Sequence, residues 1–247
     1  MRPGKMREVY ALDDPNAVMP GSEVPRSGLA VSPARCLEEV LEAWAIVYRS
    51  YLAAGRIARN ALGLHTLPEA IGPHATVLIG RLDGLSATTL TVIGDSDSDR
   101  GLPLDYRFAE ALAAWRGAGR RLMAVDLFGD RRQHSTRSSS AIYELLHHAF
   151  FLALYEGATD LLCAVPAHHV PLYRNHFGFE AVDEANPAAC LMRAAVVGAL
   201  DVAIERSTCA HFLKQPVPEK AFAGRFDFDP AVVAASPLGQ WMREHMG

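Results

Sequence analysis

The stretch from Arg120 to Arg132, RRLMAVDLFGDRR, constrains the fold more than any other part of the chain. A short apolar run lies between two basic pairs and is interrupted by one carboxylate, that of Asp126. Side chains alternate along a strand, so Ala124, Asp126 and Phe128 would share one face. Buried charges persist only when they are paired. The stretch therefore predicts a strand that either carries a satisfied structural carboxylate or opens into a site at Asp126.

Composition limits the functional classes. The chain has 247 residues, of which 50% are hydrophobic, enough for one large domain or a domain with an appendage. Its formal net charge of −4 argues against a nucleic-acid or anionic-membrane surface, so a basic partner site must be a local patch. The four cysteines form no CxxC pair, and no signal peptide or membrane span is visible. These features predict a cytoplasmic protein with reduced thiols.

The first part of the chain changes character near residue 35. Residues 1–34 are rich in Pro, Gly and Ser, which predicts an extended or partly disordered arm. From Arg35 apolar residues recur at helical spacing, and Gly55 is a plausible C-terminal stop. The domain is therefore predicted to span residues 35–197, with a helical extension over residues 198–247.

Strands and helices then alternate. Two β-rich runs, Ala75–Leu82 and Ala87–Gly94, predict an antiparallel hairpin that turns at Asp83 and Gly84. The later predicted elements are a helix over Leu104–Trp115, the central strand, a helix over Ala141–Glu156, a strand over Leu161–Val165, a short helix after His168, and strands over Phe179–Val182 and Ala189–Val197. This order predicts an α/β or α+β fold whose mixed sheet has helices on both faces. No GxGxxG or P-loop motif supports a nucleotide-binding function.

No metal site is predicted from the histidines. His147 and His148 are adjacent within the long helix, so they point about 100° apart and cannot chelate one ion as an i, i+4 pair does. We expect them to be structural or surface residues.

Two blocks of sequence resemble one family. The segment HHVPLYRNHFGF and the element order resemble the GNAT (Gcn5-related N-acetyltransferase) fold, in which a helix carrying a Tyr and ending in Gly-Phe follows the fifth strand. The segment GLPLDYRFAEALAAWRGAGRRLMAVDLFGDRR resembles the core of the N-acyl amino acid synthases, GNAT-fold relatives of acyl-homoserine lactone synthases. The resemblance covers about residues 38–197.

The resemblance implies an acyltransferase that acts on an amino acid. Its members take a long acyl chain from the 4′-phosphopantetheine thioester of acyl carrier protein and pass it to the α-amine, with no bound cofactor. The coenzyme-A pyrophosphate loop, Q/R-x-x-G-x-G/A, is missing from LFGDRRQHSTR, which favours a carrier-protein donor over coenzyme A thioester. Two positions depart from the relatives: the family glutamate falls on Ala124, and the arginine in the first helix of acyl-homoserine lactone synthases falls near Trp44.

Acyl transfer to an amine needs a base, a polarised carbonyl and an acid for the departing thiolate. Asp126 is the predicted base, because it lies on the strand face of the missing glutamate; His169 is the alternative. Tyr173 is the predicted acid by resemblance to the GNAT helix tyrosine. Backbone amides around Leu127 and Phe128 would polarise the carbonyl if the strand bulges there.

Basic residues after the central strand are candidates for donor binding. Arg131, Arg132 and Arg137 could bind the phosphopantetheine phosphate or an acidic carrier-protein helix, because arginine forks match phosphate geometry. A solvated basic loop explains the same residues equally well.

An acyl pocket is predicted around Tyr48, Tyr51 and Leu52, although core packing accounts for the same residues equally well. Two other functions stay open. The Ala124 change could mark a non-catalytic relative that binds acyl chains or acyl carrier protein, or the fold could serve a coenzyme-A-dependent small-molecule acetyltransferase.

Overall fold

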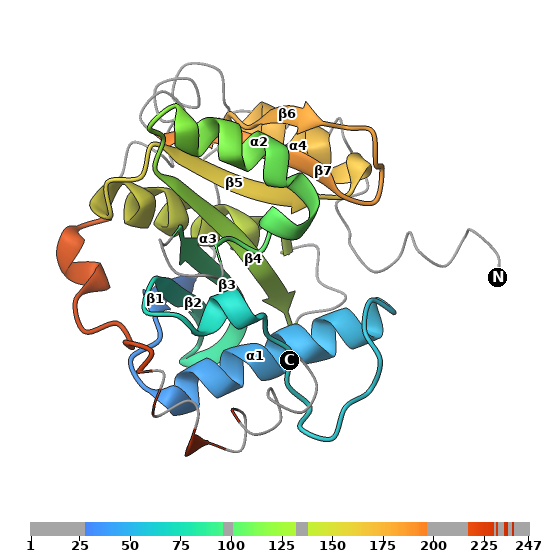
Figure 1. Ribbon diagram of the computed structural model, residues 1–247. Helices are drawn as coiled ribbons and strands as arrows, with labels where there is room; N and C mark the ends of the chain where they lie inside the picture. Colours follow the sequence, from blue (N-terminus) through green and yellow to red (C-terminus); the bar gives the residue numbers. More distant parts are fainter. Residues whose placement is uncertain are drawn as a thin grey trace.

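The described residues form a seven-stranded sheet with helices on both faces (Figure 1). The computed structural model describes residues 28–95, 101–131, 138–196 and 217–229 and the single positions 231, 235, 236 and 239. The strands are β1 (Leu29–Pro33), β2 (Ala75–Leu82), β3 (Leu85–Gly94), β4 (Leu122–Asp130), β5 (Asp160–Val165), β6 (Glu180–Asp183) and β7 (Cys190–Ala195). They lie in the order β1-β2-β3-β4-β5-β7-β6; β4 and β5 are parallel and the other neighbours antiparallel. The predicted mixed sheet is confirmed.

The β2–β3 hairpin forms as its turn residues require. Asp83 and Gly84 have φ angles of 52° and 80°, both in the left-handed region. A two-residue turn of this kind matches the right-handed twist of the strands and favours Asp-Gly. The predicted hairpin is confirmed, and β3 begins at Leu85, two residues before the predicted start.

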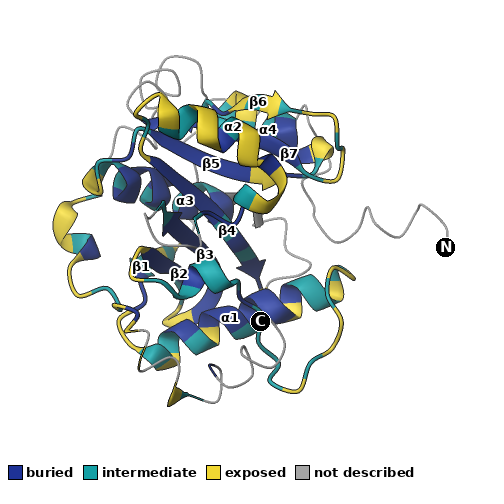
Figure 2. Cartoon of the chain, viewed as in Figure 1, coloured by how far each residue is buried: buried dark blue, intermediate teal, exposed yellow. Residues whose placement is uncertain are grey.

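Among the described residues, four α-helices cover the two faces of the sheet. They are α1 (Leu37–Ala53), α2 (Asp105–Gly117), α3 (Ser138–Tyr155) and α4 (Val170–Phe177). Side chains alternate along β4, so Ala124 joins the core beneath α1 and α2, whereas Val125 joins the core beneath α3 and α4. Figure 2 shows that β3, β4 and β5 are buried along most of their length between these layers.

The contact between α1 and β4 depends on Gly129. A Cβ atom at this position would lie 2.9 Å from both Cα and N of Val47 in α1. Only glycine permits so close an approach of two backbones without a shift. Gly129 therefore fixes how closely α1 lies over the end of β4.

The C-terminal segment, residues 217–229, runs along one side of the domain (Figure 1). It includes a 3₁₀ helix at Glu219–Phe222, whose Phe222 ring lies 5.9 Å from that of Tyr155 at the end of α3. Further on, the backbone N–H of Phe226 donates to the carbonyl of Ala34, and Phe228 stacks on Trp44 of α1. The segment thus connects the helical layers on both faces of the sheet.

Three features differ from the sequence prediction. Leu29–Pro33 pairs with β2 as an edge strand, within the stretch predicted as an arm. Further 3₁₀ helices at Pro68–Ile71 and Ala167–His169 were not predicted. The arm before residue 28 and most of the predicted helical extension lie outside the described residues. Within the described part of the chain, no helix is long and apolar enough to cross a bilayer.

Candidate active site

The parallel strands at the centre of the sheet separate. β4 pairs with β5 only from Leu122 to Ala124, although β4 continues to Asp130 and β5 to Val165. Beyond this point β4 runs toward α1 and β5 runs toward α4 (Figure 1). Asp126 lies just past the last paired residue, Ala124, so the strand carboxylate sits where the sheet opens.

β4 also bulges at this opening. Leu127 and Phe128 together oppose Leu90 of β3, because the register shifts between Thr89 and Thr91. Leu127 has a φ of 53°, a left-handed conformation that costs a non-glycine residue about 1–2 kcal/mol. Strain of this kind concentrates at functional sites. Backbone amides around Leu127 and Phe128 were predicted to polarise a carbonyl only if β4 bulges there, and this bulge is present.

The Asp126 carboxylate is held by its own backbone neighbour. The N–H of Leu127 donates to Oδ1 of Asp126 over 2.6 Å. Burial at the base of the opening raises the pKa of Asp126 above its ordinary value, and the charge of Glu69 adds to the rise; the Leu127 hydrogen bond and the charge of Arg56 oppose it. A carboxylate with a raised pKa is a better proton acceptor than a solvated one.

Tyr173 belongs to α4, which follows β5 and the 3₁₀ helix at Ala167–His169. Its ring contacts those of Phe177 and Phe179, with centroids 6.0 and 5.5 Å away. Burial raises the pKa of Tyr173 well above its ordinary value, with further contributions from Cys163, Tyr51 and Asp126. Tyr173 therefore stays protonated at neutral pH, as a proton donor must. The contribution of Asp126 places both residues in one electrostatic environment.

His169 is the last residue of the 3₁₀ helix at Ala167–His169 and directly precedes α4. His169 and Tyr173 therefore do not lie on one continuous α-helix. Its ring is buried and lies 4.2 Å from that of His168. Burial lowers the pKa of His169 to about 4, assisted by the charges of His168 and Arg56. The imidazole is therefore neutral at neutral pH, and a weaker base than an unperturbed histidine.

Two charged residues of this neighbourhood were missed in the sequence. Arg56 follows α1, exposed, with its guanidinium carbon 5.5 Å from the ring centroid of Tyr51. Glu69 belongs to the 3₁₀ helix at Pro68–Ile71. Both act on the pKa of Asp126, and Arg56 also acts on that of His169. Neither residue belongs to a periodic pattern or motif, so only the folded chain reveals them.

The three residues predicted to line an acyl pocket differ in burial and in their contacts. Tyr48 is 9% exposed, and its hydroxyl accepts a hydrogen bond from the backbone N–H of Asn60, which fixes the loop after α1. Tyr51 and Leu52 are half-buried, and the Tyr51 ring lies 5.2 Å from that of His65. Tyr48 thus supports the loop after α1. Tyr51 lies beneath the guanidinium of Arg56 and contributes to the raised pKa of Tyr173.

Of the three predicted donor-binding arginines, only Arg131 is described. It is exposed at the end of β4 and donates to the carbonyl of Ser86 over 3.0 Å, with Glu42 of α1 at 3.9 Å. Arg132 and Arg137 lie outside the described residues.

The two departures from the relatives have structural explanations. Ala124 is 1% exposed and pairs with Ile93 and Leu162, so its position is filled by core packing, and Asp126 follows two residues later in β4. Trp44 is fully buried and stacks on Phe228 of the C-terminal segment. An apolar aromatic pair therefore fills this position of α1.

The GLPLD block stabilises the entry into α2. The N–H of Leu102 donates to Oδ2 of Asp105, and Gly101 adopts a φ of 59° directly against that carboxylate. Arg116 binds both Asp105 and Asp95, which joins the ends of α2 and β3. This motif is therefore structural.

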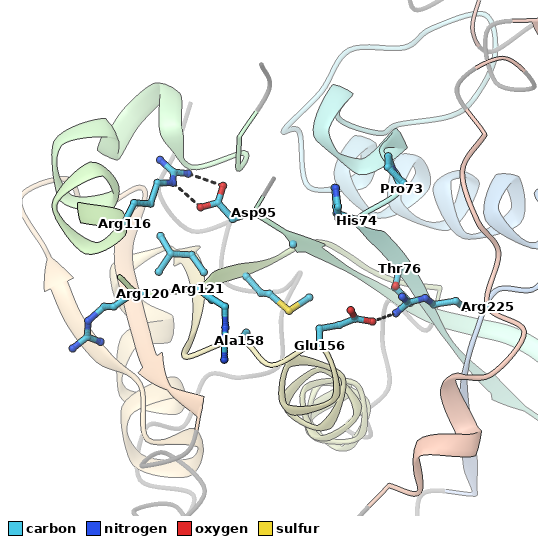
Figure 3. Close-up of a pocket in the computed structure, with 13 residues that line it drawn as sticks. Pro73, His74, Thr76, Asp95, Arg116, Arg120, Arg121, Glu156, Ala158 and Arg225 are labelled. Carbon is cyan, nitrogen blue, oxygen red and sulfur yellow. Dashed lines mark hydrogen bonds and ion pairs between the residues drawn. The ribbon is translucent and has the colours of Figure 1, made fainter. Parts of the chain in front are cut away.

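A cavity of about 430 Å³ lies at the opposite end of β4 (Figure 3). Its basic residues are already engaged: Arg116 with Asp95, Arg225 with Glu156, and Arg121 with the carbonyl of Gly157. None of the predicted catalytic residues Asp126, His169 and Tyr173 lines this cavity.

Comparison with known proteins decides the family. The model of the N-acyl amino acid synthase FeeM family matches residues 42–201. The chain belongs to this family. The family places the chain among the acyltransferases and confirms the resemblance predicted from the sequence. No curated protein sequence matches the chain.

Solved structures share the fold of this FeeM-family chain. FeeM itself, an N-acyl amino acid synthase from uncultured soil microbes, superposes with a TM-score of 0.62 and 22% identity over 74% of this chain and 96% of FeeM. BjaI, a coenzyme-A-dependent acyl-homoserine lactone synthase solved with SAM and isopentyl-CoA, has a TM-score of 0.53 and 13% identity over 76% of this chain and 92% of its own. The acyl-homoserine lactone synthase LasI has a TM-score of 0.50 and 9% identity over 68% and 89%.

Proposed function

We propose that the protein transfers a long-chain acyl group from the thioester of acyl carrier protein to the α-amine of an amino acid. One observation carries the proposal: in a chain of the N-acyl amino acid synthase family, β4 and β5 separate just before Asp126, whose charge acts on the pKa of Tyr173. A thioester inserted there would have a carboxylate on one side and a phenol on the other.

The transfer then follows from the positions of these groups. Asp126 takes a proton from the acceptor ammonium, directly or through water, which frees the nitrogen lone pair. The nitrogen attacks the thioester carbonyl while backbone amides of the β4 bulge stabilise the oxyanion. The C–N bond forms, the C–S bond breaks, and Tyr173 gives its proton to the departing thiolate. The amide nitrogen then loses its second proton to water, and water reprotonates the Tyr173 phenolate. His169, neutral at neutral pH, is the alternative base.

The charges around the opening suit an α-amino acid. The carboxylates of Asp126 and Glu69 attract the ammonium, and the guanidinium of Arg56 can bind the α-carboxylate through its fork of N–H donors. The Arg56 side chain is exposed and long, so its guanidinium can move into contact with a bound ligand. Tyr51, beneath Arg56, and Leu52 would border the acyl chain or the acceptor side chain.

For the donor, the observations favour a carrier protein. Arg131 presents an exposed charge just after the end of β4, and the sequence that follows lacks the glycines of a coenzyme-A pyrophosphate loop. Binding would rely on the phosphopantetheine phosphate and the acidic carrier surface, both anionic.

The test is product detection by mass spectrometry. The purified protein is incubated with long-chain acyl carrier protein and a pool of amino acids, and in parallel with the matching acyl-coenzyme A. We expect an N-acyl amino acid, formed faster from the carrier protein. Products only from acyl-coenzyme A would replace the donor. No product from either donor, with retained binding of acylated carrier, would establish a non-catalytic binding protein.

Two variants test the assigned charges. Arg56→Gln should raise KM for the amino acid and abolish the preference for it over the corresponding decarboxylated amine, with KM for the donor unchanged. Arg59→Gln, exposed in the same loop, is the control. Arg131→Glu combined with Arg132→Glu should weaken carrier binding and leave the reaction with acyl-coenzyme A intact. Equal carrier affinity in this variant and the wild type would remove the arginines from the donor site.

A further inference from the structure

The side of α3 turned away from the sheet carries a group of potential metal ligands that acyl transfer does not use. One ligand atom from each of Glu144, His147 and His148 lies within 4.8 Å of the other two. With about 100° between successive residues, these side chains lie on the side of α3 opposite to Ile142 and Ala149, which belong to the core. The group therefore lies apart from the sheet and from the opening beside Asp126.

The carboxylate completes what the two histidines alone lack. Adjacent histidines diverge on a helix, but Glu144 precedes them by three and four residues and lies between them on the helix surface. A carboxylate oxygen and two imidazole nitrogens are common ligands of zinc and related first-row ions.

The His148 ring is already oriented for binding. Its Nδ1 lies 2.8 Å from the backbone carbonyl of Glu144. A carbonyl oxygen only accepts, so Nδ1 carries the proton and the lone pair remains on Nε2. Metal-binding histidines commonly donate their other ring N–H to a backbone carbonyl, which fixes the tautomer and the ring.

The surroundings shelter the group from bulk water. His147 is 6% exposed, and its ring lies 5.1 Å from that of Phe151 one turn later and 5.6 Å from that of His148. Glu144 and His148 are half-buried. A tetrahedral zinc site places ligand atoms about 3.4 Å apart, so side-chain rotations that move these atoms by about 1 Å would suffice.

The geometry points to a binding site for one divalent ion of the zinc class at Glu144, His147 and His148, with one bound water molecule as the fourth ligand. Such an ion would join two successive turns in the middle of α3. It would stabilise α3, which packs against β2 and β3. This effect on stability would not depend on acyl transfer.

The test uses the full chain freed of metal with a chelator. All proteins carry Cys36→Ser, because Cys36 is exposed and its thiolate would compete for zinc; serine also suits this N-terminal cap of α1. Zn²⁺ is titrated by calorimetry, and Co²⁺ by the visible absorption of tetrahedral cobalt. We expect one equivalent bound and, at a hundredfold excess of Zn²⁺ over the dissociation constant, a rise in Tm of about 5–10 °C.

Two variants and a control identify the ligands. Glu144→Gln and His148→Ala should each weaken Zn²⁺ binding about tenfold or more and remove the cobalt absorption. His74→Gln removes an exposed histidine at the far cavity and should bind as the parent does. Absence of stoichiometric binding by the parent, or equal binding by both ligand variants, would overturn the site. Circular dichroism of the metal-free variants establishes that they are folded.

Discussion

Replacement of Asp126 by Asn should lower kcat/KM and raise the free energy of unfolding. These opposite effects test the assignment of Asp126 as the base. Asparagine has the same shape, and its Oδ1 can still accept the 2.6 Å hydrogen bond from the N–H of Leu127. The β4 bulge is therefore retained while the base is lost. General-base catalysis contributes about 10²–10⁴-fold, so kcat/KM should fall by that factor, equivalent to about 2.7–5.5 kcal/mol in the transition state.

The gain in stability follows from the raised pKa of Asp126. Because burial raises this pKa, the native state binds the proton more tightly than the unfolded state, whose value is near 3.8. Native stability due to this group is therefore complete below pH 3.8 and is lost as the pH rises through the higher folded pKa. Asparagine does not titrate, so the variant should unfold at higher urea concentration at pH 7, and the difference should vanish below pH 3.8.

Both results are measured on the same protein. Initial rates with acyl carrier protein are measured from about pH 5 to about pH 9. The rate of the wild type should fall toward the acidic end of this range, and that of the variant should not. Asp83→Asn is the matched control, since asparagine tolerates the left-handed turn and this residue lies far along the sheet from Asp126. Unchanged kcat/KM in Asp126→Asn would transfer the role of base to His169.

Three further substitutions test other parts of the structure. Tyr173→Phe keeps the aromatic packing but removes the proton donor, so kcat should fall about 10²-fold or more with little change in Tm; an unchanged kcat would refute the assignment. Gly129→Ala places a Cβ 2.9 Å from Cα of Val47 and should cost about 1–3 kcal/mol of unfolding free energy, seen as a lower urea midpoint. Asp160→Ala leaves two arginine partners of a fully buried carboxylate unpaired, which should cost about 3–5 kcal/mol; a smaller loss in calorimetry would show that water replaces the carboxylate.

Most of the fold could be predicted because its signals are local. The hairpin follows from Asp83 and Gly84, and α4 ends at Gly178, whose φ of 67° completes a left-handed cap. β1 lacked such a signal, because a five-residue edge strand with Ser and Pro has little apolar alternation. Its partner β2 supplies the pairing, which is a property of the tertiary structure.

The site was predictable only in part. Asp126 stands out as a carboxylate in an apolar strand, and Tyr173 follows from the family pattern. Arg56 and Glu69 lie in connections between elements, where nothing in the spacing relates them to β4. The bulge was equally hidden, because its left-handed residue is Leu127 and not the glycine that usually marks this conformation.

The C-terminal segment means that the unit that folds extends beyond the part of the chain that the family shares. The family match ends at residue 201, but Phe228 lies 2% exposed against Trp44, and Phe226 is hydrogen-bonded to Ala34. A chain cut at the end of the family match would leave a tryptophan-lined apolar surface in water, on the helix α1 that packs against β4. Fusion partners and truncations designed from the family boundary would therefore disturb the domain, whereas a split placed after residue 229 leaves this contact whole.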